Sequence, residues 1–122
     1  MSDDIKKQNM FTLSASYILE QLEKTDEQII GSQFLLQHFI ESGQEAHRLL
    51  IPTVVDILWL NYSIVKTITP YVEDPVTVDN PDTGEEEYMI DEPALLTLQT
   101  LMVSRFSVNK ELNQLSYTIG IH

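Results

Sequence analysis

Residues 10–42 read MFTLSASYILEQLEKTDEQIIGSQFLLQHFIES, and their spacing decides the fold. Apolar and small residues recur there at alternating steps of four and three. This is the spacing of one helix face that packs against another helix at a shallow angle. The residues of this seam are Phe11, Ala15, Ile18, Leu22, Thr25, Ile29, Ser32, Leu36 and Phe39. The pattern predicts a helix over residues 10–42.

A second interpretation divides this helix in two. The tetrapeptide Thr25-Asp26-Glu27-Gln28 fits a capping box, in which Thr25 would begin a new helix and Gln28 would reach back to it. No Gly or Pro occurs at the possible break, although a loop between antiparallel helices usually needs one. We therefore favour one long helix that ends at Ser42-Gly43, because Gly adopts the left-handed conformation of a helix C-terminus.

The next segment, residues 44–68, predicts a second helix. Its apolar residues cover more than one stripe, which is typical of a helix that is buried on most sides. Pro52 lacks an amide hydrogen and should kink this helix or mark its first turn, and Thr69-Pro70 should end it. Asp56 interrupts the apolar run, so a helix of a soluble protein fits better than a membrane span.

The negative charge of the chain is concentrated in one window. The 122 residues hold 19 acids and seven Lys or Arg, which gives a net charge of −12. Nine of the acids lie in residues 73–92, where no Lys or Arg occurs, so the rest of the chain is near −3. A chain of this charge repels phosphate, and we expect no direct binding to nucleic acid.

Within this window the sequence predicts an acidic β-hairpin over about residues 75–90. Two β-prone runs, 76–78 and 88–90, flank a stretch in which Asn80, Pro81 and Asp82 suit a type I turn. Gly84 can supply a positive φ before the return strand. The whole of residues 73–92 is interpreted as an insertion in a single domain of residues 1–122.

The remaining residues predict a third helix followed by a strand. Asp91-Glu92-Pro93 is a typical helix start, and the next charged residue is Arg105, so this half of the helix should be deeply buried. Alternation in residues 115–122, with Leu115, Tyr117, Ile119 and Ile121 on one side, predicts a half-buried C-terminal strand. Such a strand would pair with the hairpin or with a neighbouring subunit.

Several side chains carry more specific expectations about the core. Asp56 and Arg105 each interrupt an apolar helix, and we expect them to form a buried ion pair, although an exposed Asp56 is about as consistent with the sequence. The large aromatic residues are more often core than ligand-stacking groups. We therefore assign four of them to the core: Phe34, Trp59, Tyr62 and Phe106.

Catalytic and metal-binding patterns do not occur. The chain has no Cys, its three His do not form an H-E-x-x-H motif, and no phosphate-binding Gly-rich loop is present. The acidic window fails the EF-hand pattern, because Ile90 would take the twelfth position, where Glu is needed. We expect no cofactor, no metal and no enzyme activity from local motifs, while an enzyme or ligand binder with a dispersed site has no support in the sequence.

The sequence thus predicts a mainly α protein, a bundle of three long helices with an inserted acidic hairpin and a C-terminal strand. We expect a non-enzymatic assembly subunit of an oligomer or larger particle, and connector-like components of viral particles offer an analogy of architecture only. The alternative is an acidic inhibitor that occupies a basic groove of a nucleic-acid-handling protein. The N-terminus lacks a signal peptide pattern, so the cytoplasm or a particle assembled there is expected, without a membrane. The expected protein-binding residues are Asp79, Asp82, Glu85, Glu86, Glu87, Tyr117, Ile119 and Ile121.

Overall fold

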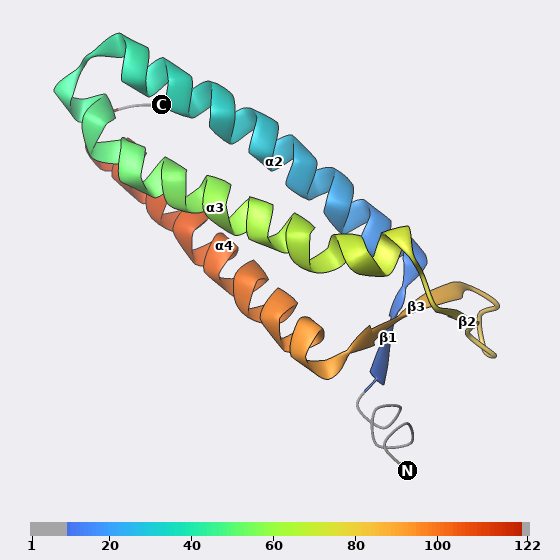
Figure 1. The fold of residues 1–122 in the computed structure, drawn as a ribbon. Helices are drawn as coiled ribbons and strands as arrows, with labels where there is room; N and C mark the ends of the chain where they lie inside the picture. The colour runs from blue at the N-terminus through green and yellow to red at the C-terminus, as the bar shows by residue number, and fades with distance from the viewer. Residues whose placement is uncertain (1–9, 121–122) are drawn as a thin grey trace.

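The computed structural model describes residues 10–120, which form three long helices and a small antiparallel sheet at one end (Figure 1). The elements are β1 (Met10–Ser14), α2 (Ala15–Ser42), α3 (Glu45–Glu73), β2 (Thr77–Asp79), β3 (Glu86–Asp91) and α4 (Glu92–Thr118). The prediction of a mainly helical protein with three helices is confirmed. In Figure 1, α3 lies between α2 and α4.

α2 is one unbroken helix, as the seam predicted. Every seam position from Ala15 to Phe39 is buried or half-buried. Thr25, the candidate break, is fully buried in the middle of the helix and its Oγ1 donates a hydrogen bond to the carbonyl of Gln21 at 2.6 Å. This bond to the preceding turn lets a small polar residue occupy the seam without ending the helix.

The first five residues of the predicted helix instead form β1. This strand pairs antiparallel with β3, with Met10 opposite Asp91 and Ser14 opposite Glu87, so the strand order is β1-β3-β2. Ser14 then caps α2, its side chain accepting a hydrogen bond from the amide of Tyr17 at 3.4 Å. The helical interpretation of residues 10–14 is wrong, because β3 offers these residues a strand edge that the local pattern does not reveal.

α3 extends beyond its predicted end at Pro70. Pro70 lies inside the last turn of the helix, which continues to Glu73, and the amide of Asp74 donates to the Pro70 carbonyl at 3.4 Å. A proline near the end removes only one helical hydrogen bond. Pro52 also lies inside the helix. In the turn between α2 and α3, Gly43 has φ 65°, the left-handed conformation expected at the end of α2.

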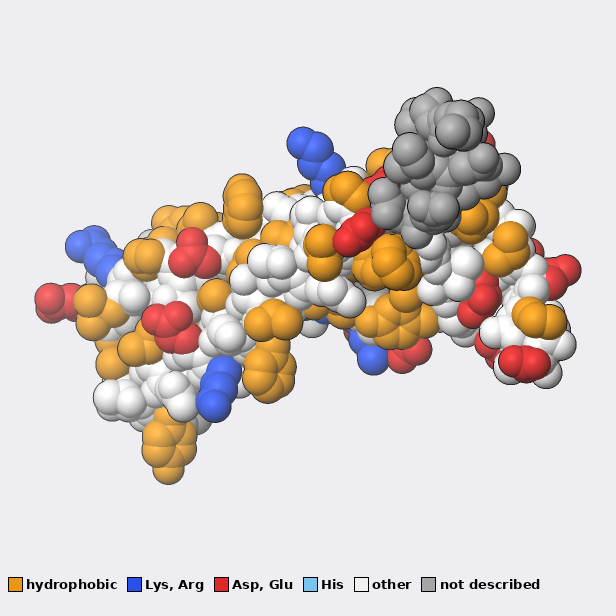
Figure 2. Space-filling model, turned by 90° about the horizontal axis from the view of Figure 1, so that it is seen from below, with side chains coloured by type: hydrophobic (Ala, Val, Ile, Leu, Met, Phe, Trp, Pro, Cys, Tyr) orange, Lys and Arg blue, Asp and Glu red, His pale blue; other side chains and the backbone are white. Residues whose placement is uncertain are grey.

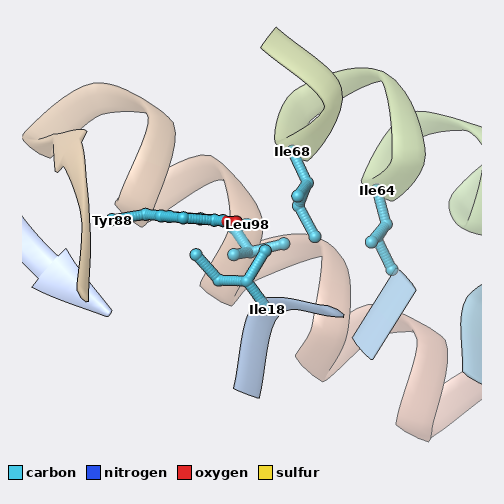
Figure 3. Packing of buried hydrophobic residues seen from close by; sticks show 5 residues of the cluster. All are labelled: Ile18, Ile64, Ile68, Tyr88 and Leu98. Carbon is cyan, nitrogen blue, oxygen red and sulfur yellow. The ribbon is translucent and has the colours of Figure 1, made fainter. Parts of the chain in front are cut away.

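The core consists of two clusters. Ile18, Ile64, Ile68, Tyr88 and Leu98 join all three helices to β3, as Figure 3 shows. A second cluster of Phe39, Leu50 and Val54 lies near the turn between α2 and α3. Because Tyr88 belongs to the first cluster, the sheet is packed onto the end of the bundle and its hairpin connection projects from that end.

Residues 115–120, the described part of the predicted C-terminal strand, do not form a strand. α4 continues to Thr118, whose Oγ1 donates to the carbonyl of Gln114 at 2.8 Å, and the amide of Ile119 donates to Leu115. The helix carries these residues to the end of the molecule opposite the sheet, where β3 offers no edge (Figure 1). Ile119 packs against the second cluster, Tyr117 is exposed, and Ile121 lies outside the described residues.

Candidate interaction surfaces

Large aromatic side chains stand on the outside of all three helices. The exposed fraction is 72% for Phe34 in α2, 64% for Trp59 in α3 and 72% for Phe106 in α4, and Tyr62 is also exposed. The assignment of these four residues to the core is therefore wrong. The expectation of a deeply buried α4 fails as well, since Leu98 and Arg105 are its buried residues.

The reason is that a three-helix protein leaves the outer side of each helix without a neighbour. α3 carries an exposed stripe of Val55, Trp59 and Tyr62, at the i, i+4 and i+7 positions of one helix face. α4 carries another, with Leu96 and Val103 seven residues apart. Figure 2 shows hydrophobic side chains along the length of one face of the molecule. Helical spacing relative to the buried positions was the signal that could have identified these stripes.

The predicted acidic residues lie together on the β2–β3 hairpin. Asp79 pairs with Glu86 across the two strands, and Asp82 and Glu85 lie in the connection between them. These four are exposed, while Glu87 is half-buried. Acidic side chains gather at this end of the molecule in Figure 2, on the right. Like charges opposite each other on paired strands repel, so this end favours a cationic neighbour.

The connection itself is held by Asn80. Its Oδ1 accepts hydrogen bonds from the amides of Asp82 at 2.8 Å and Thr83 at 3.2 Å, and its carbonyl accepts from Gly84, which has φ 71°. The turn therefore has a defined conformation. Within residues 10–120 the ion pair found is Lys24 with Glu20 at 3.0 Å, on the surface of α2, so no described Lys or Arg neutralises the hairpin.

The expected ion pair between Asp56 and Arg105 is absent from the described residues. Asp56 is exposed on α3. Arg105 is only 8% exposed, and its Nη1 donates to Thr25 Oγ1 at 2.8 Å and to Asn61 Oδ1 at 3.1 Å. The prediction found the buried cation but chose the wrong partner, because neutral oxygens of Thr and Asn satisfied the guanidinium instead of a carboxylate.

This Arg105 cluster takes one side chain from each helix and is fully connected. Asn61 also donates through Nδ2 to the Ile57 carbonyl at 2.9 Å. Burial lowers the pKa of Arg105. The guanidinium still keeps its charge at neutral pH, since arginine has so high an intrinsic pKa. The cluster fixes the helices to one another and lies inside the bundle, so it belongs to the fold rather than to an interaction surface.

A Ser–His pair occurs at the turn between α2 and α3. Ser42 Oγ and His47 Nδ1 are 2.6 Å apart, and the His47 ring stacks on Phe39 with centroids 4.8 Å apart. A catalytic pair of this kind needs a third group to orient the His, and in residues 10–120 no carboxylate bonds to His47. The hydroxyl also bonds to the carbonyl of Phe39 and the amide of Gln44, which is the arrangement of a closed turn.

Two further features of the described residues bear on the class of protein. α3 is long and apolar enough to cross a membrane by length and composition, with 39% of its most apolar window buried, and core helices of soluble proteins pass the same test. Residues 10–120 contain no group of three or more His, Asp or Glu arranged to hold a metal ion.

Comparison with known proteins gives no assignment. No protein family matches the chain, and neither a curated protein nor a solved structure is significantly similar to it. A functional proposal therefore depends on the surfaces described above.

Proposed function

We propose that the chain is a non-enzymatic assembly subunit whose outer helix faces pack against other protein subunits. The observation that supports this is the exposure of one large aromatic residue on each helix, namely Phe34, Trp59 and Phe106. Monomeric soluble proteins rarely leave large contiguous apolar patches in water. Aromatic residues are enriched at protein interfaces, where they contribute much of the binding energy.

The experiment is a mass measurement by sedimentation equilibrium over a wide range of protein concentration. We expect the wild-type chain to show a multiple of its 14.0 kDa mass. The variant Phe34→Ser/Trp59→Ser/Phe106→Ser should have a lower mass with an unchanged far-ultraviolet circular dichroism spectrum, because the three side chains are largely exposed to solvent within one chain. A mass of 14.0 kDa for both proteins at every concentration would overturn the proposal.

Lipid is the competing explanation for exposed apolar helices. The charged residues Arg48, Asp56 and Lys66 are spread along α3 and would be costly within a bilayer, which favours protein partners. Flotation with phosphatidylcholine vesicles separates the two explanations. We expect the chain to remain unbound, and flotation of wild type but not of the triple serine variant would overturn the assignment to protein partners.

The exposed carboxylates of the hairpin favour a second candidate function, that of an acidic inhibitor of a basic protein. Asp79, Asp82, Glu85 and Glu86 are exposed without a described cationic partner, so they could occupy a basic groove. A poly-lysine peptide at low salt provides the probe. The variant Glu85→Gln/Glu86→Gln/Glu87→Gln should lose most of the binding, and equal binding by both proteins would rule out the hairpin as the contact.

A further inference from the structure

The outer faces of α2 and α3 carry two strips with the same spacing and opposite charge. The α2 strip begins with Glu23 and continues at +7, +11, +14 and +18. The α3 strip begins with Arg48 and continues at the same four steps. The α2 strip is Glu23, Ile30, Phe34, Gln37 and Glu41, and the α3 strip is Arg48, Val55, Trp59, Tyr62 and Lys66. Eighteen residues make five helical turns, so each strip is a straight line of about 27 Å.

All ten side chains of the two strips are exposed. Each strip has a charge at each end, acidic on α2 and basic on α3, and the residues between the charges are apolar or aromatic except Gln37. Gln37 Nε2 donates to Glu41 Oε1 at 3.0 Å, which holds one terminal acid in place. Asp56 lies about 80° around α3 from the line between Arg48 and Lys66, so no acid interrupts the α3 strip.

The two strips lie next to each other and run in opposite directions. A hydrogen bond of 2.7 Å from Gln33 Nε2 to the Tyr62 hydroxyl crosses the exposed surface between α2 and α3. The helices are adjacent along their length (Figure 1), and Arg105 bonds to both Thr25 and Asn61, which places these two residues at the same level. Glu23 is therefore level with Ser63, so the Glu23 end of one strip lies within one helical turn of the Lys66 end of the other.

We propose that this face binds a second copy of the chain and forms a two-fold symmetric four-helix bundle. A two-fold axis parallel to α2 and α3, in the plane of the interface, places the α2 strip of each copy over the α3 strip of the other. Because the facing ends of the two strips lie within one helical turn of each other, the long side chains of Glu23 and the partner's Lys66 meet, and so do those of Glu41 and the partner's Arg48. Phe34 then lies within one helical turn of the partner's Val55.

Charge complementarity selects this arrangement over the alternatives. Packing of α2 on α2 would bring acids against acids, and packing of α3 on α3 would bring cations against cations, and both cost free energy. The face is about 27 Å long and about two helix diameters wide, so two copies bury of order 1,000 Å², near the lower limit of a specific interface. This inference rests on the proposed function and identifies the partner subunit as a second copy of the chain.

Two variants with reversed charge test the inference. Glu23→Lys/Glu41→Lys makes both strips basic, and Arg48→Glu/Lys66→Glu makes both strips acidic. Each variant alone should dissociate to 14.0 kDa and self-associate at least tenfold more weakly than wild type. An equimolar mixture should regain the dimer as a heterodimer, detected by native mass spectrometry with one chain isotopically labelled. Circular dichroism checks that both variants fold.

A matched control on α4 locates the effect. Lys110→Glu/Glu111→Lys reverses two exposed charges outside both strips and should keep the dimer. If wild type is oligomeric but the charge reversals leave its mass unchanged, or the mixture fails to reassociate, this interface is wrong and the assembly function stands. If wild type remains at 14.0 kDa at every concentration, both the interface and the self-assembly are overturned.

Discussion

Arg105 Nη1 lies 2.8 Å from Thr25 Oγ1, which joins residues 80 positions apart in the sequence. The same nitrogen donates to Asn61, so one guanidinium group contacts α2 and α3 from its place on α4. Buried polar groups need partners at fixed positions, whereas apolar contacts tolerate sliding. The cluster therefore specifies the relative height of the three helices.

Removal of the guanidinium should be strongly destabilising. We expect Arg105→Ala to lower the free energy of unfolding by about 2–4 kcal/mol, because it leaves Thr25 and Asn61 without their donor and opens a cavity. Urea unfolding followed by circular dichroism measures the change. A loss below about 0.5 kcal/mol would contradict a structural role for the cluster.

Replacement of the whole cluster provides the matched control. We expect Arg105→Met/Asn61→Leu/Thr25→Val to recover most of the stability that Arg105→Ala loses, because apolar groups of similar size leave no unpaired polar atom. The same urea experiment applies. If the triple variant were less stable than Arg105→Ala, packing rather than hydrogen bonding would limit the site.

A second prediction concerns alkaline pH. The Tyr71 hydroxyl donates to Asp91 Oδ2, while Oδ1 of the same carboxylate accepts from the amide of Ala94 at 2.9 Å at the start of α4. Burial, and then this hydrogen bond, raise the pKa of Tyr71 from 10.0 to about 12. Since the folded state holds its proton more tightly, the resulting stabilisation is complete below pH 10 and is lost as the pH rises through about 12.

The variant Tyr71→Phe isolates this effect. It should be about 1 kcal/mol less stable than wild type at neutral pH, because it lacks the hydrogen bond to Asp91. The difference should shrink between pH 10 and pH 12, where wild type alone loses the Tyr71 contribution. Parallel stability profiles for the two proteins across that range would show that Tyr71 does not hold its proton unusually tightly.

Two glycines should respond to alanine in opposite directions. Gly43 has φ 65° at the end of α2, where a Cβ is strained, so Gly43→Ala should cost about 1 kcal/mol. Gly31 lies inside α2, and a Cβ added there would meet nothing within 4 Å, so Gly31→Ala should stabilise the chain by up to about 1 kcal/mol. Thermal melts measure the change in melting temperature for both variants. A change in the same direction for both would contradict the prediction.

Truncation of Leu98 should destabilise the chain more than truncation of Phe106, although Phe106 is the larger of these two residues of α4. Leu98 is buried in the first core cluster, and Leu98→Ala should cost about 2–5 kcal/mol. Phe106 points outward, and Phe106→Ala should change the free energy of unfolding of the dissociated chain by less than about 0.5 kcal/mol. Urea unfolding in dilute solution compares them, and a large loss for Phe106→Ala would place that ring in the core.

The sequence predicted the long-range pattern of α2 because its seam repeats over many turns. It misassigned residues 10–14 because five residues fit the start of a helical seam and a strand equally well, and the deciding partner, β3, lies far along the chain. The alternation near Tyr117 misled for a similar reason, since Leu115 and Tyr117 also fit the end of a helix, and both lie in α4.

The outer surfaces were harder to predict than the elements. An apolar helix such as α3 indicates burial, but its sequence does not say whether its own chain or another subunit covers Trp59. Likewise the sequence identified Arg105 as unusual but not its partners, because Thr25 and Asn61 are common residues without charge. The acidic segment was easier to recognise in the sequence, since residues 73–92 contain no Lys or Arg and the turn residues are neighbours in the chain.

The pairing of β1 with β3 has a consequence for synthesis of the chain. Residues leave the ribosome in order, so Met10–Ser14 emerge long before Glu86–Asp91, and α2 and α3 meet before Arg105 exists. β1 is unpaired on both edges until β3 emerges, and Thr25 and Asn61 lack their donor until Arg105 emerges. The nascent chain is therefore most vulnerable to aggregation between completion of α3 and completion of α4, when a chaperone that covers a strand edge would protect it best.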